Sequence, residues 1–237
     1  MKILALETSA KAASCAVSED GARVAFAYQN SGLTHSRTLM PMVRDMLRNA
    51  GLGPGDIGAV ACAVGPGSFT GLRIGVAAAK GFAWAGELPC AAVSTLEAMA
   101  AQSSFLEGIV CPVMDARRGQ FYNALFECGG GSCRRLCPDR AIDVGELADQ
   151  LAGYKKTVFL VGDGALLCYN MVENSLENVV PAPEALRWQT AWGVALCAEE
   201  KARRGELCTA SRLEPVYLRL SQAERERLER LSREKKQ

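Results

Sequence analysis

A glycine-rich segment between two apolar runs is the part of this sequence best suited to binding an anion. Residues 63–75 read AVGPGSFTGLRIG, after the run AVACAV and before the helix-like run LRIGVAAAKGFAWAG. Glycines between a strand and a helix often cradle phosphate, because N–H groups at a helix N-terminus point at the anion. The spacing fits neither common phosphate motif. No frame supplies the second glycine of a Walker A loop, and Gly65, Gly67 and Gly71 have one residue too many for G-x-G-x-x-G.

The same segment is typical of a tight turn that starts a helix. Gly65-Pro66-Gly67 would turn the chain, and the hydroxyl of Ser68 or Thr70 would cap the helix by accepting hydrogen bonds from its free N–H groups. We therefore predict a structural turn here, with a dinucleotide site as the alternative.

Other residues that could catalyse a reaction or bind a metal are scarce. The sequence contains one histidine, His35, which excludes a metal site built on a histidine pair. No paired-carboxylate motif, nucleophile elbow or H-E-x-x-H occurs. The cluster Cys128, Cys133 and Cys137 has neither C-x-x-C spacing nor a nearby histidine, so we expect no zinc site, and its role stays open. We expect neither a metal nor a cofactor.

Composition places the chain among globular proteins. It has 237 residues, of which 49% are hydrophobic, enough for one large domain or two of ordinary size. A net charge of +1 gives no general attraction to nucleic acid or membrane. The N-terminus MKILALETSA is interrupted by Glu7 too early for a signal peptide, and no stretch reaches the roughly 18 apolar residues of a membrane span. These features predict a cytoplasmic protein whose ten cysteines are reduced thiols.

The pattern of elements occurs twice along the chain. Strands are predicted over 3–8, 14–18, 22–29, 57–64 and 89–93, with helices over 36–50, 69–86 and 94–103. The second copy has strands over 109–116, 119–127, 133–138, 156–162 and 178–182, with helices over 144–153, 164–174 and 183–205. Asp163 is expected to cap the 164–174 helix.

This order, β-β-β-α-β-α-β-α repeated, predicts an α/β protein of two duplicated ribonuclease-H-like lobes. The architecture would be that of actin, Hsp70 and sugar kinases, with a cleft between the lobes. We expect an N-terminal lobe over 1–104 and a C-terminal lobe over 105–205, whose last long helix packs back toward the first lobe. Residues 206–237 would be a return segment and a charged tail, which reads as a solvated helix or a frayed end.

Four segments together resemble the TsaB (YeaZ) family. They are HSRTLMPMVRDML, GPGSFTGLRIG, MDARRGQFY and EPVYLR, and they follow the family's order across nearly the whole chain. The resemblance implies a partner of the TsaD-like catalytic subunit in making threonylcarbamoyladenosine in tRNA, with a TsaE-like ATPase as third component. It also implies that the chain is a non-catalytic, dimerising scaffold that contacts tRNA only indirectly, through the complex with these two subunits.

The first hairpin departs from the nucleotide-binding pattern of this architecture. The usual hairpin carries Asp-x-Gly-Thr, whereas this chain has Glu7-Thr8-Ser9-Ala10. Without the glycine, the backbone could not approach a phosphate as closely. Glu7, Thr8, Ser9 and Asp115 are therefore candidates for weak nucleotide binding only. For Asp115 we favour an ion pair with Arg117 that closes a turn.

The helix after the glycine turn carries a stripe of small residues, Gly71, Gly75 and Ala79. Such a stripe lets another helix approach closely, and glycine within a helix costs up to ~1 kcal/mol relative to alanine. We predict a partner surface on the 36–50 and 69–86 helices, with burial inside the lobe as the alternative. The predicted interface residues are His35, Leu39, Met42, Met46, Phe69, Leu72, Arg73, Gly75, Val76 and Lys80.

A two-fold homodimer would set these helices against their copies as a four-helix bundle. The resemblance implies that the TsaD contact uses the same surface, so we expect the two complexes to exclude each other. Two other functions stay open. One is an ATP-dependent transferase or kinase-like enzyme that uses the interlobe cleft. The other is a peptidase acting on TsaD, for which no Ser–His or Cys–His pair is readable around His35.

Overall fold

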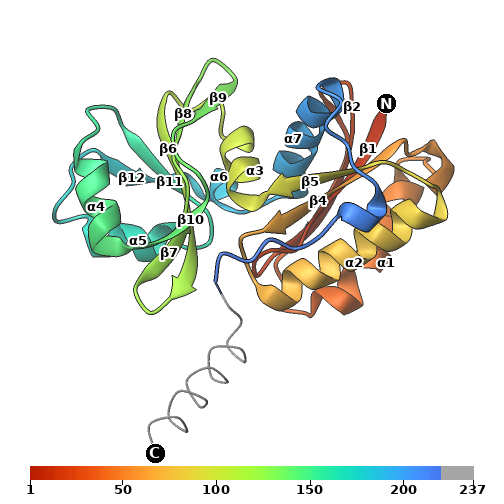
Figure 1. The fold of residues 1–237 in the computed structure, drawn as a ribbon, viewed down its shortest axis with the longest axis horizontal. Coiled ribbons are helices and arrows are strands. Elements are labelled where there is room, and N and C mark those ends of the chain that lie inside the picture. The colour runs from red at the N-terminus through yellow and green to blue at the C-terminus, as the bar shows by residue number, and fades with distance from the viewer. Residues whose placement is uncertain (220–237) are drawn as a thin grey trace, which may run out of the picture.

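The computed structural model describes residues 1–219, which form two α/β lobes side by side (Figure 1). The predicted tail beyond Arg219 lies outside the described residues. Elements of the first sheet lie within residues 1–104, and those of the second within 105–205. No helix among residues 1–219 is long and apolar enough to cross a membrane.

The first lobe contains a five-stranded sheet in the order β3-β2-β1-β4-β5. β1 pairs antiparallel with β2 and parallel with β4, and the sequence prediction for this lobe is confirmed element by element. The strands are β1 (Lys2–Glu7), β2 (Ala13–Glu19), β3 (Ala22–Gln29), β4 (Ala59–Gly65) and β5 (Cys90–Ser94). The helices are α1 (His35–Asn49), α2 (Phe69–Ala85) and α3 (Thr95–Gln102), with a 3₁₀ turn at Pro54–Asp56.

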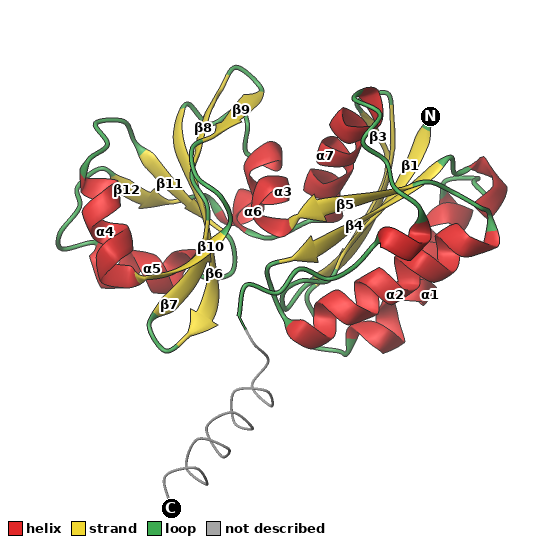
Figure 2. Ribbon diagram, viewed as in Figure 1, coloured by secondary structure: helices red, strands yellow, loops and turns green. Residues whose placement is uncertain are grey.

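Helices cover both faces of this sheet. α1 and α2 lie side by side on one face (Figure 2) and share a core with the strands that includes Leu6, Leu39 and Val76. α7 (Ala191–Arg203), which follows the second sheet in the chain, packs with α3 on the other face, where alanines dominate the contact. Small side chains allow this close packing of helix on sheet.

The second lobe repeats the strand order as β10-β7-β6-β11-β12, with β8 and β9 as an added hairpin on β6. Its strands are β6 (Gly108–Arg117), β7 (Gln120–Asn123), β8 (Phe126–Gly129), β9 (Ser132–Arg135), β10 (Arg140–Asp143), β11 (Val158–Val161) and β12 (Val179–Pro181). Its helices are α4 (Val144–Ala152), α5 (Ala165–Val172) and α6 (Glu184–Arg187).

Three predictions for the second lobe are wrong. The predicted 119–127 strand is two strands, because β7 pairs with one end of β6 and β8 with the other. The third strand of the repeat is β10, whereas 133–138 falls on the hairpin strand β9 and the loop after it. The predicted 183–205 helix breaks after Arg187 and restarts at Ala191, where Thr190 caps α7 by accepting from the Gly193 N–H.

The return segment, residues 206–219, runs from the edge of the first sheet toward the space between the lobes (Figure 1). Cys208 exchanges backbone hydrogen bonds with Cys90 of β5, and the Val216 N–H donates to the Val64 carbonyl of β4 at 2.7 Å. A 3₁₀ turn at Ala210–Arg212 lies against α2. The Arg219 guanidinium donates to the Ala116 carbonyl of the second lobe, so this segment contacts both lobes.

Candidate functional site

The residues that lead into the β1–β2 turn are packed into the chain. Glu7, Thr8 and Ser9 are all buried. The Thr8 hydroxyl donates to the Gly71 carbonyl at 2.8 Å, and the Ser68 N–H donates to the Ser9 carbonyl at 2.7 Å. The turn is therefore held against the start of α2 by its own hydrogen bonds.

The glycines of the opening motif allow three segments of this chain to meet. A Cβ added at Gly65 would overlap the Val216 carbonyl of the return segment. One added at Gly67 would overlap the Ser9 carbonyl, and one at Gly71 the Thr8 carbonyl. The α2 N-cap is Ser68, whose side chain accepts from the Gly71 N–H, while Thr70 lies within the first turn. The motif is a structural junction.

The predicted role of the small-residue stripe is wrong. Gly71, Gly75 and Ala79 face the sheet, and a Cβ at Gly75 would overlap the Thr8 hydroxyl. The alternative interpretation, burial inside the lobe, is the one that the structure supports. Close packing on β1 and β4 compensates for the unfavourable helix propensity of glycine here. The Cys62 Sγ atom, for example, lies 3.3 Å from the position that a Cβ at Gly75 would occupy.

Half of the predicted interface residues are unavailable to a partner because they fill the chain's own core. These are Leu39, Met46, Leu72, Gly75 and Val76. The reason is helical geometry: residues at spacings of three and four share one face, and here that face lies on the sheet.

The remaining predicted residues lie nearer the surface, and most have partners within the chain. Phe69 stacks on Tyr217 of the return segment, and the Arg73 guanidinium lies over the Phe69 ring and donates to the Tyr217 hydroxyl at 3.0 Å. Lys80 Nζ donates to the Ser211 carbonyl at 3.3 Å. Met42 is half-buried against the core.

His35 is also engaged within the chain. Its Nε2 lies 2.8 Å from the Ala10 carbonyl, which ties the start of α1 to the β1–β2 turn. Nδ1 has no hydrogen-bond partner among the described residues. The peptidase alternative would require this ring to bond a serine hydroxyl or cysteine thiol, and no such bond occurs within residues 1–219.

The outward faces of α1 and α2 form the exposed surface of these helices. On α2 the exposed positions include Arg73, Ala77, Gly81 and Trp84; on α1 they include Arg37, Met40, Pro41 and Arg44. We call these eight residues the outer α1–α2 surface. Trp84 is 75% exposed, and a Cβ at Gly81 would meet nothing within 4 Å.

The predicted list of interface residues left out Ala77, Gly81 and Trp84, although Gly81 is a glycine within a helix and was already expected to need close packing. The signal that could have found them is the face opposite Leu72 and Val76, because residues that share a helix with core residues but lie half a turn away must point outward.

A cleft of about 560 Å³ lies between the lobes. It is lined by the β1–β2 turn, the start of α2, the β6–β7 turn and the return segment. The Asp115 carboxylate accepts from the Arg117 backbone N–H at 2.6 Å, so the predicted side-chain ion pair is replaced by a bond to the main chain. Asp163 accepts from Gln189 at 2.7 Å, and the N-cap of α5 is Gly164, so the predicted capping role of Asp163 is wrong.

Glu7 is the one acid of the β1–β2 turn, and it is buried at this junction. Its Oε1 accepts from the Ser9 N–H at 2.5 Å, and Oε2 has no hydrogen-bond partner among the described residues. Burial raises the pKa of Glu7 to about 7, with the Ser9 hydrogen bonds opposing that rise and the nearby Asp163 charge adding to it. A buried, partly neutral carboxyl is poorly suited to hold the magnesium of a nucleotide.

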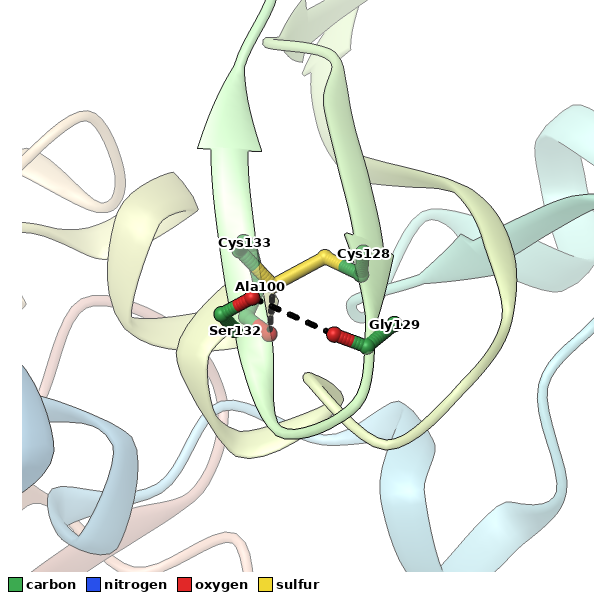
Figure 3. The surroundings of a disulfide bond; sticks show 5 residues. All are labelled: Ala100, Cys128, Gly129, Ser132 and Cys133. Atoms are coloured by element: carbon green, nitrogen blue, oxygen red, sulfur yellow. Dashed lines mark hydrogen bonds between the residues drawn. A yellow bond between two sulfur atoms is a disulfide. The ribbon is translucent and has the colours of Figure 1, made fainter.

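The cysteine cluster contains a disulfide. Cys128 and Cys133 lie opposite each other in the β8–β9 hairpin with Cα atoms 4.2 Å apart and are bonded (Figure 3). The prediction of reduced thiols is wrong for this pair, because the strand register places the two sulfurs together. Cys137 is free, and its Sγ accepts from the Leu125 N–H. Within residues 1–219 no group of three or more metal-ligating side chains occurs.

Comparison with known proteins places the chain in a family. Residues 29–227 match the family model described as TsaD, tRNA N6-adenosine threonylcarbamoyltransferase. A Bacillus subtilis relative, described as tRNA threonylcarbamoyladenosine biosynthesis protein TsaB, is 31% identical over 94% of this chain and 96% of its own length. The chain belongs to the TsaB (YeaZ) family.

Other relatives agree with this assignment. The TsaB of Escherichia coli is 40% identical over 54% of this chain and 55% of its own length. The solved structure of YeaZ from Pseudomonas aeruginosa has a TM-score of 0.79 at 29% identity and covers 92% of this chain and 99% of its own. The Acidaminococcus fermentans (R)-2-hydroxyglutaryl-CoA dehydratase component A, with a TM-score of 0.51 at 14% identity over 86% of this chain and 99% of its own, shares the fold alone. The predicted actin/Hsp70/sugar-kinase-like fold of two lobes is confirmed.

Proposed function

We propose that this TsaB family member is a non-catalytic scaffold subunit. It would bind and position a TsaD-like catalytic subunit for threonylcarbamoyl transfer to tRNA, with a TsaE-like ATPase as the third component. The observation that carries the proposal is the exposed Trp84 beside Gly81 on the outer α1–α2 surface, in a family whose curated relatives are described as threonylcarbamoyladenosine biosynthesis proteins. This subunit would contact tRNA only indirectly, as part of the assembled complex.

Two features of this surface suit a protein partner. Tryptophan contributes more to protein–protein binding than most residues, and a solvent-exposed one costs free energy in an isolated subunit. Gly81 lies inside a helix with open space beside it, so nothing in the described part of this chain offsets its ~1 kcal/mol cost relative to alanine. A partner helix that approaches closely there would supply the compensation.

The partner prediction can be tested with Gly81→Leu. A leucine there has room in the isolated chain and favours the helix, so the fold should be retained while close approach of a partner is blocked. We expect affinity for the TsaD-like subunit to fall at least about 30-fold, as at an interface hot spot. Isothermal titration calorimetry measures the affinity, and circular dichroism checks the fold.

Asn170→Leu is the matched control, because it adds a leucine to an exposed position of α5 in the other lobe. Its affinity for the TsaD-like subunit should equal that of the wild type. If Gly81→Leu binds the TsaD-like subunit as tightly as the wild type does, the outer α1–α2 surface is not part of the interface.

The enzyme alternative predicts that the isolated chain binds ATP in the interlobe cleft. Thr8 and Ser9 are buried against α2, and the return segment lines the cleft mouth. We therefore expect calorimetry with ATP and magnesium to give no saturable heat at protein concentrations that detect micromolar binding. Saturable binding that Thr8→Gly strengthens would favour the cleft-binding enzyme over the scaffold.

A further inference from the structure

Two free cysteines lie opposite each other where the return segment pairs with the edge of the first sheet. Cys90, the first residue of β5, and Cys208 exchange both backbone hydrogen bonds, at 2.7 and 2.8 Å. Residues directly opposite each other in an antiparallel pair point to the same face of the sheet. Both side chains pack on the core that the sheet shares with α1 and α2. The two thiols are therefore neighbours, although they are far apart in the sequence.

The spacing of the two residues fits a disulfide bond. Residues that exchange both backbone bonds in an antiparallel pair have Cα atoms about 5.5 Å apart, and disulfides join cysteines whose Cα atoms are about 4.4–6.8 Å apart. Formation of the bond therefore requires rotation of the side chains and not movement of the backbone. Cys90 and Cys208 are both free thiols in this structure, so the supply of oxidant decides whether they are joined.

The two thiols differ in their access to solvent. Cys208 is partly exposed and lines a surface pocket of about 580 Å³ beside Trp84 and Leu88. Cys90 is fully buried, and burial raises its pKa to about 11, with nearby Cys208 adding to the rise and Lys80 opposing it. Because the thiolate is the nucleophile and must reach its target, a reagent from solvent reacts first at Cys208.

We propose that Cys90 and Cys208 form a reversible redox site, at which a low-molecular-weight disulfide such as oxidised glutathione produces a bond between them. The Cys208 thiolate attacks one sulfur of oxidised glutathione, forming a mixed disulfide and releasing one glutathione thiolate. The Cys90 thiolate then attacks Cys208 Sγ, forming the bond between the two cysteines and releasing the second glutathione thiolate. The two protons of the cysteine thiols pass through solvent to the glutathione thiolates, so two thiols are oxidised and one disulfide is reduced.

The bond would tether the return segment to the first lobe. Among residues 1–219, backbone hydrogen bonds join this segment to the first sheet at two places, Cys208 and Val216. A segment held by so few bonds opens locally more easily than a core strand does. The Val216 carbonyl fills the space beside Gly65, and the Arg219 guanidinium contacts the second lobe. The redox state of the pair would therefore control how freely the segment between the lobes leaves the glycine junction.

The test is carried out on the full chain alone, so it does not depend on the proposed scaffold function. The chain is incubated at rising ratios of oxidised to reduced glutathione, until the glutathione is almost entirely oxidised. Free thiols are then alkylated, and disulfide-linked peptides are identified by mass spectrometry. We expect a linked peptide of Cys90 and Cys208 that increases with the ratio and disappears when dithiothreitol is added. Hydrogen exchange over residues 209–217 should be at least about tenfold slower in the oxidised chain than in the reduced chain.

Two substitutions separate the steps of the reaction. Cys90→Ser should leave Cys208 as a mixed disulfide with glutathione, because the thiol that completes the exchange is absent. Cys208→Ser should leave Cys90 unmodified, because Cys90 is fully buried. Cys137→Ser is the matched control, since it removes the other partly exposed free thiol and should leave the yield of the linked peptide unchanged.

The proposal is overturned if the wild type yields no linked peptide of Cys90 and Cys208 at any glutathione ratio. It is also overturned if residues 209–217 exchange equally fast in the oxidised and reduced chains. Attachment of glutathione to Cys90 in the Cys208→Ser chain would contradict the order of the two steps. The peptide and exchange measurements use the wild type, so they decide the matter even if a serine variant does not fold.

Discussion

Gly71→Ala should lower the free energy of unfolding by about 3 kcal/mol or more, because overpacking against backbone cannot be relieved by a side-chain rotation. The added Cβ would overlap the Thr8 carbonyl, which belongs to the hydrogen-bonded junction between β1 and α2. Gly75→Leu should have a still larger effect, since Thr8 and Cys62 both occupy the space that it needs. Urea denaturation measures the loss, and the far-ultraviolet circular dichroism shows whether the variant still folds.

Gly81→Ala is the matched control in the same helix. Its Cβ meets nothing within 4 Å, so the substitution should raise the free energy of unfolding by up to ~1 kcal/mol through helix propensity alone. The two glycines thus differ in the sign of the expected change. Two results would show that the stripe of small residues is a partner surface after all. One is a similar change in the free energy of unfolding for Gly71→Ala and Gly81→Ala. The other is a Gly75→Leu chain that stays folded but loses partner binding.

Glu7→Gln should abolish most of the pH dependence of stability near neutrality. The pKa of Glu7 is raised from 4.5 to about 7 in the folded chain, chiefly by burial. Between these two values the folded state keeps a proton that the unfolded state has released, so stability falls as pH rises and the loss is complete above pH 7. The full loss corresponds to about 3 kcal/mol.

Urea denaturation at pH values on both sides of neutrality measures this slope. The wild type should be less stable on the alkaline side, and Glu7→Gln should be nearly level, since its amide oxygen can keep the Ser9 hydrogen bond. Glu146→Gln, at an exposed glutamate of α4, controls for the loss of one carboxylate. A wild-type stability that rises with pH over this range would show that Glu7 is charged in the folded chain.

These two predictions concern the same junction, where the β1–β2 turn, the glycine motif and the return segment meet. At this junction Glu7, Thr8 and Ser9 are all buried from solvent. The junction therefore serves the packing of this chain on itself.

Local periodicity was enough to predict the first lobe, because each of its elements is continuous and bounded by turn residues. It failed at the 119–127 segment, where β6 is long enough to pair with two successive strands. It also failed at residues 188–190, because helix propensity on both sides hid the break that Thr190 caps. In the first case the strand boundaries depend on pairing with β6. In the second the helix boundary depends on the polar side chain of Thr190. The periodicity of apolar residues records neither of these.

The repeated α/β order, the scarcity of catalytic side chains and the TsaB resemblance could all be read from the sequence, since they depend on residue type and spacing. The sequence could not determine which side of α2 faces the sheet. Gly71, Gly75 and Ala79 would suit a partner helix or the chain's own backbone equally well, because a missing side chain specifies close approach and not what approaches. The answer came from the fold, which places Thr8 and Val216, far away in the sequence, in the space that those glycines and Gly65 leave.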